Sequence, residues 1–175
     1  MTKYFTDKDF LEARGQKRRA LTVFLIMSAI YLGVCAVLFV WYRRLPFRAD
    51  EILTIKILTG VASVIYTIVA SIYGGIKLRI AVKTYRLAVH LKTGLLEKNE
   101  ATFIRYDESI SAKDGVDMKS LIFSEWNKYK KEFFERKVLV FEHKEFPKMN
   151  ENQKYKFITQ GNVLIEYEAV EGEDI

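Results

Sequence analysis

The sequence predicts a membrane α+β protein, in which two transmembrane helices form a hairpin and a small cytosolic β domain follows. Two long runs carry no charged residue, and the pattern changes from helical to strand-like after Gly94. Residues 1–98 hold 16 Lys and Arg against 6 Asp and Glu, whereas residues 99–175 hold 12 against 16. A chain of 175 residues suffices for one modest domain with added helices, which excludes most large enzyme folds.

The first uncharged run, residues 20–42, contains 23 residues. As a helix it would extend about 34 Å, slightly more than the hydrocarbon core of a bilayer. It ends in Trp41 and Tyr42, followed by two arginines, which is the composition of a membrane interface. A cleaved signal peptide, or a lipoprotein signal ending at Cys35, fits poorly because the run is too long and does not end in small residues.

The second uncharged run covers residues 57–76, and the predicted span is 52–76 if Lys56 extends to the interface. Only residues 43–51 separate the spans, and Pro46 interrupts helix formation there. We therefore expect an antiparallel hairpin with a short external loop.

Basic residues determine the expected orientation because they resist translocation. Residues 1–19 and 77–98 each contain six Lys and Arg, whereas the connecting loop contains three, or four with Lys56. The sequence thus predicts a two-pass integral membrane protein with both termini in the cytosol.

The N-terminal segment, residues 1–19, is predicted to be cytosolic and amphipathic. Thr6 and Asp9 have the spacing of a helix cap, which we expect to open a short helix leading into the first span. Phe5, Phe10 and Leu11 are candidates for anchoring this helix at the membrane interface.

Small residues recur on one face of each span, as in membrane helices that pack closely. The predicted packing positions are Ala29, Gly33 and Ala36 on the first span and Thr59, Ser63, Thr67, Ser71 and Gly75 on the second. Packing within the hairpin is the simple interpretation. A homo-oligomer or a larger membrane partner is the alternative, because five positions form a longer groove than three fill. Gly74-Gly75 is either a close helix contact or a hinge.

Residues 77–98 are predicted to form a basic juxtamembrane helix. Arg79, Lys83, Arg86 and His90 fall on one side, and apolar residues occupy much of the other. This basic stripe could bind anionic lipid headgroups or lie on the acidic domain that follows. Alternatively, it reflects only the positive-inside bias.

Residues 99–175 are predicted to form an all-β domain. Strands are expected at 101–110, 116–126, 129–135, 137–142, 155–159 and 163–167, with 120–123 and 138–141 in the core and a loop at 143–152. Asp114-Gly115 and Gly161-Asn162 are the clearest tight turns. Five or six short strands favour a small barrel of the OB or SH3 kind, with a small sandwich as the alternative.

Nucleic acid is not an expected partner, because the β domain carries a net charge of −4 by the count above. Its aromatic residues could stack bases but are expected in the core and in hairpin pairs. They are Phe103, Tyr106, Phe123, Trp126, Tyr129, Phe133 and Phe134. The local basic patch is interpreted as a solvated strand edge; it consists of Lys128, Lys130, Lys131, Arg136 and Lys137.

No catalytic, cofactor or metal motif is recognisable. Cys35 is the single cysteine, so a cysteine metal cluster cannot form. The chain has only two histidines, isolated in the sequence, which are too few for a paired-histidine proton relay. Phosphate-binding loops and nucleophile elbows are also absent from the sequence. We therefore expect no enzyme activity and no cofactor.

The predicted function is a non-enzymatic, membrane-anchored interaction or accessory module that presents a small barrel at the cytosolic face of the membrane. Its expected partners are membrane lipids and either another protein or a second copy. The alternative is a lipid or ligand sensor that uses Arg79, Lys83, Arg86 and His90. An enzyme acting at the membrane surface is a third interpretation, which no motif supports.

Overall fold

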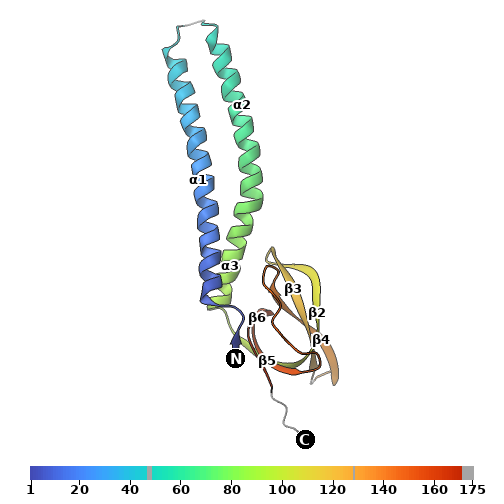
Figure 1. The fold of residues 1–175 in the computed structure, drawn as a ribbon. Coiled ribbons are helices and arrows are strands. Elements are labelled where there is room, and N and C mark those ends of the chain that lie inside the picture. Colours follow the sequence, from blue (N-terminus) through green and yellow to red (C-terminus); the bar gives the residue numbers. More distant parts are fainter. Residues whose placement is uncertain (47–48, 128, 171–175) are drawn as a thin grey trace. The chain divides into compact units, whose positions relative to one another are not determined.

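The computed structural model describes residues 1–46, 49–127 and 129–170. The chain divides into two compact units, one formed by Met1–Ala13 with Lys83–Ile175 and the other by Arg14–Val82. The first unit contains a closed β-barrel, and the second contains two long apolar helices (Figure 1).

Two continuous helical stretches account for the predicted spans. They consist of α1 (Asp7–Arg44), α2 (Glu51–Ile72), the π-helix η1 (Tyr73–Leu78) and α3 (Arg79–Thr93). The stretches Asp7–Arg44 and Glu51–Thr93 are both long and apolar enough to cross a membrane. The predicted external loop is shorter than 43–51, because α1 continues to Arg44 and α2 begins at Glu51. Residues 47–48 lie outside the described part of the chain.

Thr6 and Asp9 cap α1 as the sequence predicts. The Thr6 backbone N–H donates to the Asp9 carboxylate at 2.7 Å, and the Thr6 hydroxyl donates to the same oxygen at 2.8 Å. This arrangement satisfies an N–H group that the first turn leaves without a helical partner. The helix does not stop before the span, however, so the expected short N-terminal helix is wrong: α1 is one helix of 38 residues.

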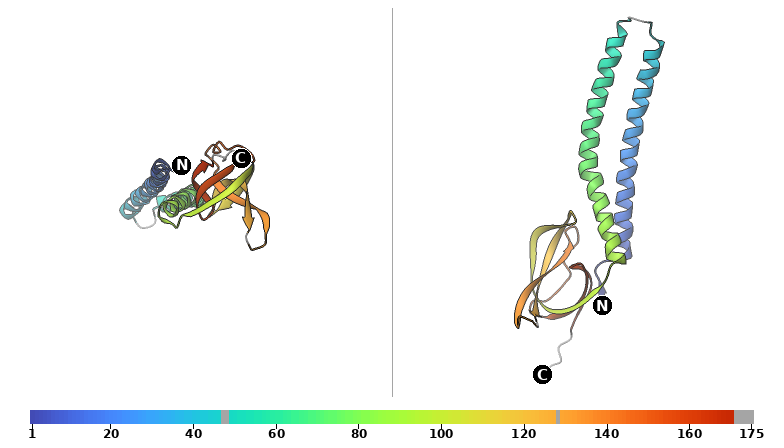
Figure 2. Two further views of the ribbon diagram at one scale, coloured as in Figure 1. Left: turned by 90° about the horizontal axis from the view of Figure 1, so that it is seen from below. Right: turned by 180° about the vertical axis from the view of Figure 1, so that it is seen from behind.

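Five strands close the barrel in the order β2-β3-β4-β6-β5, and β5 pairs back to β2 (Figures 1 and 2). Their bounds are β2, Glu97–Lys113; β3, Val116–Asn127; β4, Glu132–Phe141; β5, Lys154–Gln160; and β6, Val163–Ala169. All neighbours are antiparallel except β4 and β6, which are parallel and meet at Leu139 and Val163. A two-residue strand, β1 (Thr2–Lys3), adds to the edge of β6. The domain is therefore a closed barrel and not a sandwich.

Both predicted tight turns join paired strands. Asp114 and Gly115 have φ of 53° and 73°, and Gly161 and Asn162 have φ of 52° and 68°. Positive φ at both central residues defines a type I′ turn, whose twist matches that of the flanking strands. A Cβ added at Gly115 would also meet the end of the Lys83 side chain, which would have to move aside.

Two strands differ from their predicted bounds. β4 is one strand where two were expected, because Arg136 and Lys137 continue the pairing with β3 although they interrupt the apolar pattern. β2 begins at Glu97 and pairs there with Thr159, so the preceding helix ends at Thr93 rather than at residue 98. In both places, strand pairing outweighs the local pattern.

The barrel unit contains two apolar clusters. The barrel interior is filled by aromatic and branched residues, with Phe103, Phe123 and Phe157 at most 1% exposed. The second cluster joins α3 and the N-terminal segment to one end of the barrel. Its members are Phe5, Ala13, Leu87, Ala88, Leu91, Val116, Met118, Phe141, Val163 and Ile165. The core of this domain thus includes residues from before and after the helical hairpin.

Lys144 links the barrel to the N-terminal segment through an ion pair and a hydrogen bond. Its ammonium group lies 2.7 Å from the Asp9 carboxylate and donates to the Tyr4 carbonyl at 2.8 Å. Burial raises the pKa of Asp9, but hydrogen bonds from Lys144 and Thr6 outweigh it, so this pKa lies below its ordinary value. The carboxylate is therefore stabilised in its charged form.

Replacing Asp9 by Asn should destabilise the barrel unit by about 2 kcal/mol at neutral pH, because Lys144 and Thr6 lose a charged acceptor. The pKa of Asp9 is lower in the folded than in the unfolded chain. Its stabilising effect is therefore present above the unfolded pKa and is lost as the pH falls through the folded pKa. Urea unfolding of the full chain in detergent, followed across acidic pH, should show a flatter pH profile for D9N. An acid-side profile identical to that of the unsubstituted chain would contradict this.

Candidate functional site

The predicted basic stripe lies on α3, and its four members differ in their surroundings. Arg79, Arg86 and His90 are exposed. Within the described ranges, none of these three side chains forms an ion pair or a hydrogen bond. Lys83 is half-buried, and its side chain extends to the β2–β3 turn at Gly115. The stripe therefore presents three solvent-facing basic side chains that could meet an anionic ligand.

The apolar side of α3 is covered by the barrel and by the N-terminal segment. Leu87, Ala88 and Leu91 are at most 3% exposed. The Phe5 ring stacks on Phe141 with centroids 6.1 Å apart, and the Phe10 ring lies 5.9 Å from that of Tyr85. Phe5 and Phe10 are therefore part of the packing of the barrel unit, which corrects their expected role as interface anchors.

Large and hydroxylated side chains join the two long helices. Tyr31 and Tyr66 stack with ring centroids 4.2 Å apart. The hydroxyls of Ser28 and Tyr66 are hydrogen-bonded at 2.8 Å, and those of Tyr31 and Ser63 at 2.9 Å. Each hydroxyl thus has a partner, as polar groups require in an apolar environment.

Most of the predicted small packing residues do not lie at this contact. Thr59 and Ser63 are partly buried, but Ala29, Gly33, Ala36, Thr67, Ser71 and Gly75 are exposed. A Cβ added at Gly33 or Gly75 would meet nothing within 4 Å. The two rows thus do not face each other in the hairpin, because the tyrosine pair forms the contact instead. They remain on the surface of the helices.

A groove of about 540 Å³ lies between the two long helices, close to their connecting loop. Its lining is mainly apolar and consists of Cys35, Leu38, Phe39, Tyr42, Ile55, Lys56, Thr59, Gly60 and Ser63. Gly74 contributes to the contact farther along, where an added Cβ would lie 3.7 Å from the Phe24 ring. The π-helix falls on this Gly74-Gly75 pair.

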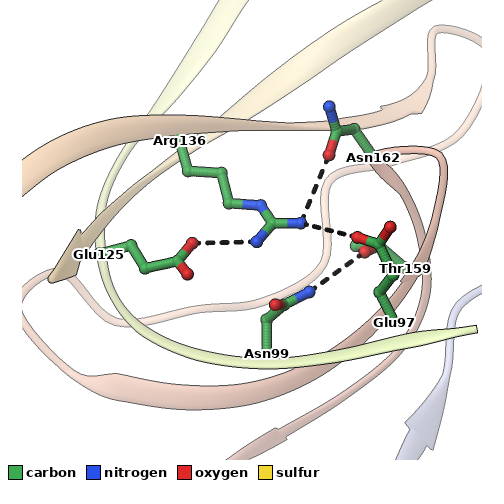
Figure 3. Close-up of polar contacts among 6 residues, drawn as sticks. All are labelled: Glu97, Asn99, Glu125, Arg136, Thr159 and Asn162. Atoms are coloured by element: carbon green, nitrogen blue, oxygen red, sulfur yellow. Dashed lines mark hydrogen bonds and ion pairs between the residues drawn. The ribbon is translucent and has the colours of Figure 1, made fainter. Parts of the chain in front are cut away.

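One end of the barrel carries a polar network centred on Arg136 (Figure 3). The Arg136 guanidinium group donates to Glu125 at 2.9 Å, to Glu97 at 3.3 Å and to the Asn162 side chain at 3.4 Å. The Arg136 side chain is only 15% exposed, and its guanidinium carbon lies 5.9 Å from the Phe157 ring centroid. The two carboxylates neutralise a cation that the barrel has largely removed from water.

Three lysines of the predicted basic patch, Lys130, Lys131 and Lys137, are exposed as expected for a solvated strand edge, but Arg136 is not. Arg136 lies in the network just described, and Lys137 pairs with Asp107 at 3.5 Å. Lys130 lies 3.9 Å from Glu132, and Lys131 is exposed. Lys128 is outside the described residues.

The aromatic residues of the β domain fall into two groups. Phe103, Phe123 and, partly buried, Tyr106 belong to the core as expected. The end of the β3–β4 hairpin instead exposes four aromatic side chains, the aromatic tip: Trp126 (49% exposed), Tyr129 (99%), Phe133 (70%) and Phe134 (40%). Trp126 and Phe133 form the expected hairpin pair, with centroids 4.9 Å apart. Tyr129 lies in the turn and not in the core, which corrects the prediction.

The described residues contain no metal-binding cluster. No group of three or more His, Cys, Asp and Glu side chains there is placed to hold a metal ion. The sequence had indicated neither the aromatic tip nor the Arg136 network as surfaces. The signal for the tip was the run of aromatic and lysine residues around a turn, which also fits a buried hairpin.

No family model, curated protein or solved structure matches the chain.

Arg136→Gln should destabilise the barrel by about 2–3 kcal/mol, because Glu97 and Glu125 would face each other without their cation. Arg105→Gln is the matched control. Arg105 pairs with Glu135 at 3.3 Å, but both side chains are 55% exposed, so we expect a loss of about 0.5 kcal/mol or less. Urea unfolding of the full chain in detergent measures both values. Equal losses would show that the network contributes no more than a surface ion pair.

Proposed function

We propose that this protein is a non-enzymatic, membrane-anchored interaction module. Its two long helices cross the membrane as a hairpin, both termini lie in the cytosol, and the barrel binds another protein or a second copy. The supporting observation for binding is the aromatic tip, since large apolar side chains on a β-hairpin are the residues that protein interfaces bury.

Membrane insertion is supported by the apolar side chains that the helices leave exposed. Leu32, Val37 and Phe39 on α1 are 63–68% exposed, and Leu53, Val64 and Ile72 on α2 are 59–66% exposed. In the spanning windows only 6% of residues are buried by the protein itself. Lipid is the environment in which such surfaces are stable.

The orientation is supported by the composition of the barrel unit. Residues 1–13 and 83–170 share one folded core, so the two ends of the hairpin belong on the same side of a membrane. The Lys and Arg content of residues 1–19 and 77–98 favours the cytosolic side.

We infer that the barrel is of the OB type and not the SH3 type. The hairpins β2–β3–β4 are followed by a long connection, residues 142–153, which returns β5 to the side of β2. The resulting order β5-β2-β3-β4 is a Greek key, and β6 then closes five strands into a barrel. The acidic charge of this domain disfavours the nucleic-acid binding found in many OB folds.

Lipid sensing is the second candidate function, and the exposed side chains of Arg79, Arg86 and His90 favour it. Each basic side chain near an anionic bilayer contributes about 1 kcal/mol to binding. If the chain senses lipid, anionic lipid should co-purify with it. This lipid should be lost on charge reversal at Arg79 and Arg86, but not on charge reversal at the control positions Lys98 and Lys156.

Thiol labelling of intact cells tests the anchored topology. In a Cys35→Ser background, Asp50→Cys should react with a membrane-impermeant maleimide in intact cells, because Asp50 is exposed and lies in the external loop. Tyr129→Cys, at a position where the side chain is 99% exposed, should react only after the cells are permeabilised. The opposite labelling pattern would invert the topology, and a chain that stays soluble without detergent would exclude a membrane anchor.

Purification in mild detergent tests the interaction. The full chain should elute as a defined oligomer or with a second protein at a fixed ratio. Tyr129→Ser combined with Phe133→Ser should reduce this assembly about tenfold or more, since truncating interface aromatics costs 1–2 kcal/mol or more each. Ile110→Ser is the matched control, because Ile110 is 60% exposed on β2 away from the tip. A chain that elutes alone and monomeric would contradict the proposal.

A further inference from the structure

The groove between the two long helices extends from near the connecting loop along the apolar part of the hairpin. Its lining comes from residues 35–42 on α1 and 55–63 on α2, all within the unit Arg14–Val82. At 1.5 Å per residue, these segments extend about 10–12 Å along the helices. Half of the hydrocarbon core of a bilayer is about 15 Å thick, so the groove has most of the depth of one leaflet. Its volume of about 540 Å³ is that of a small-ligand site.

The inner end of the groove, away from the loop, offers an apolar surface. The Thr59 hydroxyl donates to the Ile55 carbonyl at 2.8 Å, and the Ser63 hydroxyl donates to the Thr59 carbonyl at 2.8 Å. The Tyr31 hydroxyl lies 2.9 Å from that of Ser63 and is hydrogen-bonded to it. A hydrocarbon chain can therefore occupy this end without depriving a hydroxyl group of its partner. The other residues of the lining here carry neither a hydroxyl nor a charge; they are Cys35, Leu38, Phe39 and Gly60.

The loop end of the groove, lined by Tyr42 and Lys56, is cationic instead. Within the described ranges, neither the Lys56 ammonium group nor the Tyr42 hydroxyl has an ion-pair or hydrogen-bond partner, and Asp50 and Glu51 form no ion pair there either. Lys56 is exposed, and its aliphatic stem lets the ammonium group reach the headgroup level, where tyrosines of spanning helices also lie. The loop end thus presents two hydrogen-bond donors for which the described residues supply no acceptor.

We propose that this groove binds an anionic phospholipid of the leaflet that faces away from the cytosol. The lipid phosphate accepts hydrogen bonds from the Lys56 ammonium group and the Tyr42 hydroxyl, and an acyl chain lies along the apolar inner end. This inference goes beyond the proposed interaction function and rests only on its membrane topology. The site is distinct from the basic stripe of α3, which lies at the opposite end of the second long helix.

Charge selects a phospholipid, and not a helix of a second copy, as the occupant. The lining segments 35–42 and 55–63 contain no Asp or Glu and a single Lys. Copies inserted in one orientation share the same depth, so a second copy would bring another Lys56 to this level and no carboxylate. A phospholipid supplies a phosphate and then hydrocarbon, in the order in which the groove presents its cationic end and its apolar end.

Filling the groove tests the site. A Cβ added at Gly60 would meet nothing within 4 Å, so Gly60→Leu fits the helix and takes up groove volume. Gly33→Leu is the matched control, because Gly33 is also an exposed helix glycine with nothing within 4 Å and does not line the groove. Native mass spectrometry of the full chain in detergent should show a retained phosphatidylglycerol for the unsubstituted chain and for Gly33→Leu. Gly60→Leu should bind it about tenfold more weakly.

Removing the charge tests the headgroup contact independently of the space in the groove. Lys56→Gln should weaken phosphatidylglycerol binding about fivefold and abolish the preference over phosphatidylcholine, because one cation near the phosphate is lost. Lys77→Gln is the matched control, since Lys77 is exposed at the other end of the span and does not line the groove. It should leave binding unchanged.

Three results would overturn the inference. The first is equal lipid binding by Gly60→Leu and Gly33→Leu, or no retained lipid at all. The second is lipid that is lost on charge reversal at Arg79 and Arg86 but kept by Lys56→Gln, which would locate the lipid at α3. The third is a lipid-free dimer that only Gly60→Leu dissociates, which would make a second copy the occupant. If the thiol-labelling pattern stays as proposed, each of these results excludes the lipid site alone and leaves the membrane topology standing.

Discussion

The packing of α3 and the N-terminal segment against one end of the barrel is the constraint on which the rest depends. Phe5 and Ala13 come from before the helical hairpin, and Leu87, Ala88 and Leu91 come from after it. Because they share one core, the chain must return after α1 and α2 to the domain where it began. An antiparallel hairpin is the natural result, and an odd number of membrane crossings would be incompatible with this core.

Several basic side chains of the barrel are ion-paired, whereas the aromatic tip leaves apolar side chains exposed. Arg136 is neutralised by Glu97 and Glu125, Lys137 by Asp107, and Lys144 by Asp9. Long basic side chains also cover outward apolar positions, since Ile122 lies between Arg105 and Lys137 in the strand register and is only 1% exposed. The tip gathers four exposed aromatic side chains, so binding a partner there would bury apolar area.

In the helical hairpin, the side chains that join the two helices differ from those that face outward. Stacked tyrosines and paired hydroxyls supply its contacts, and the rows of small residues face outward. Small outward rows allow close approach of another helix in lipid, and so this surface is compatible with assembly of the whole chain.

The sequence by itself determined the two long helices, the cap at Thr6 and the two type I′ turns. These features depend on uncharged length or on residues that are close in the chain, so local chemistry suffices. It also indicated a small barrel from the number and spacing of its strands. Only the tertiary structure decided that β1 joins β6, that Phe5 is buried, that Arg136 is enclosed by two carboxylates and that four aromatic residues are exposed. Each of these depends on which distant segments of the chain meet. The identity of a Phe or an Arg does not tell whether a distant segment buries its side chain or water surrounds it.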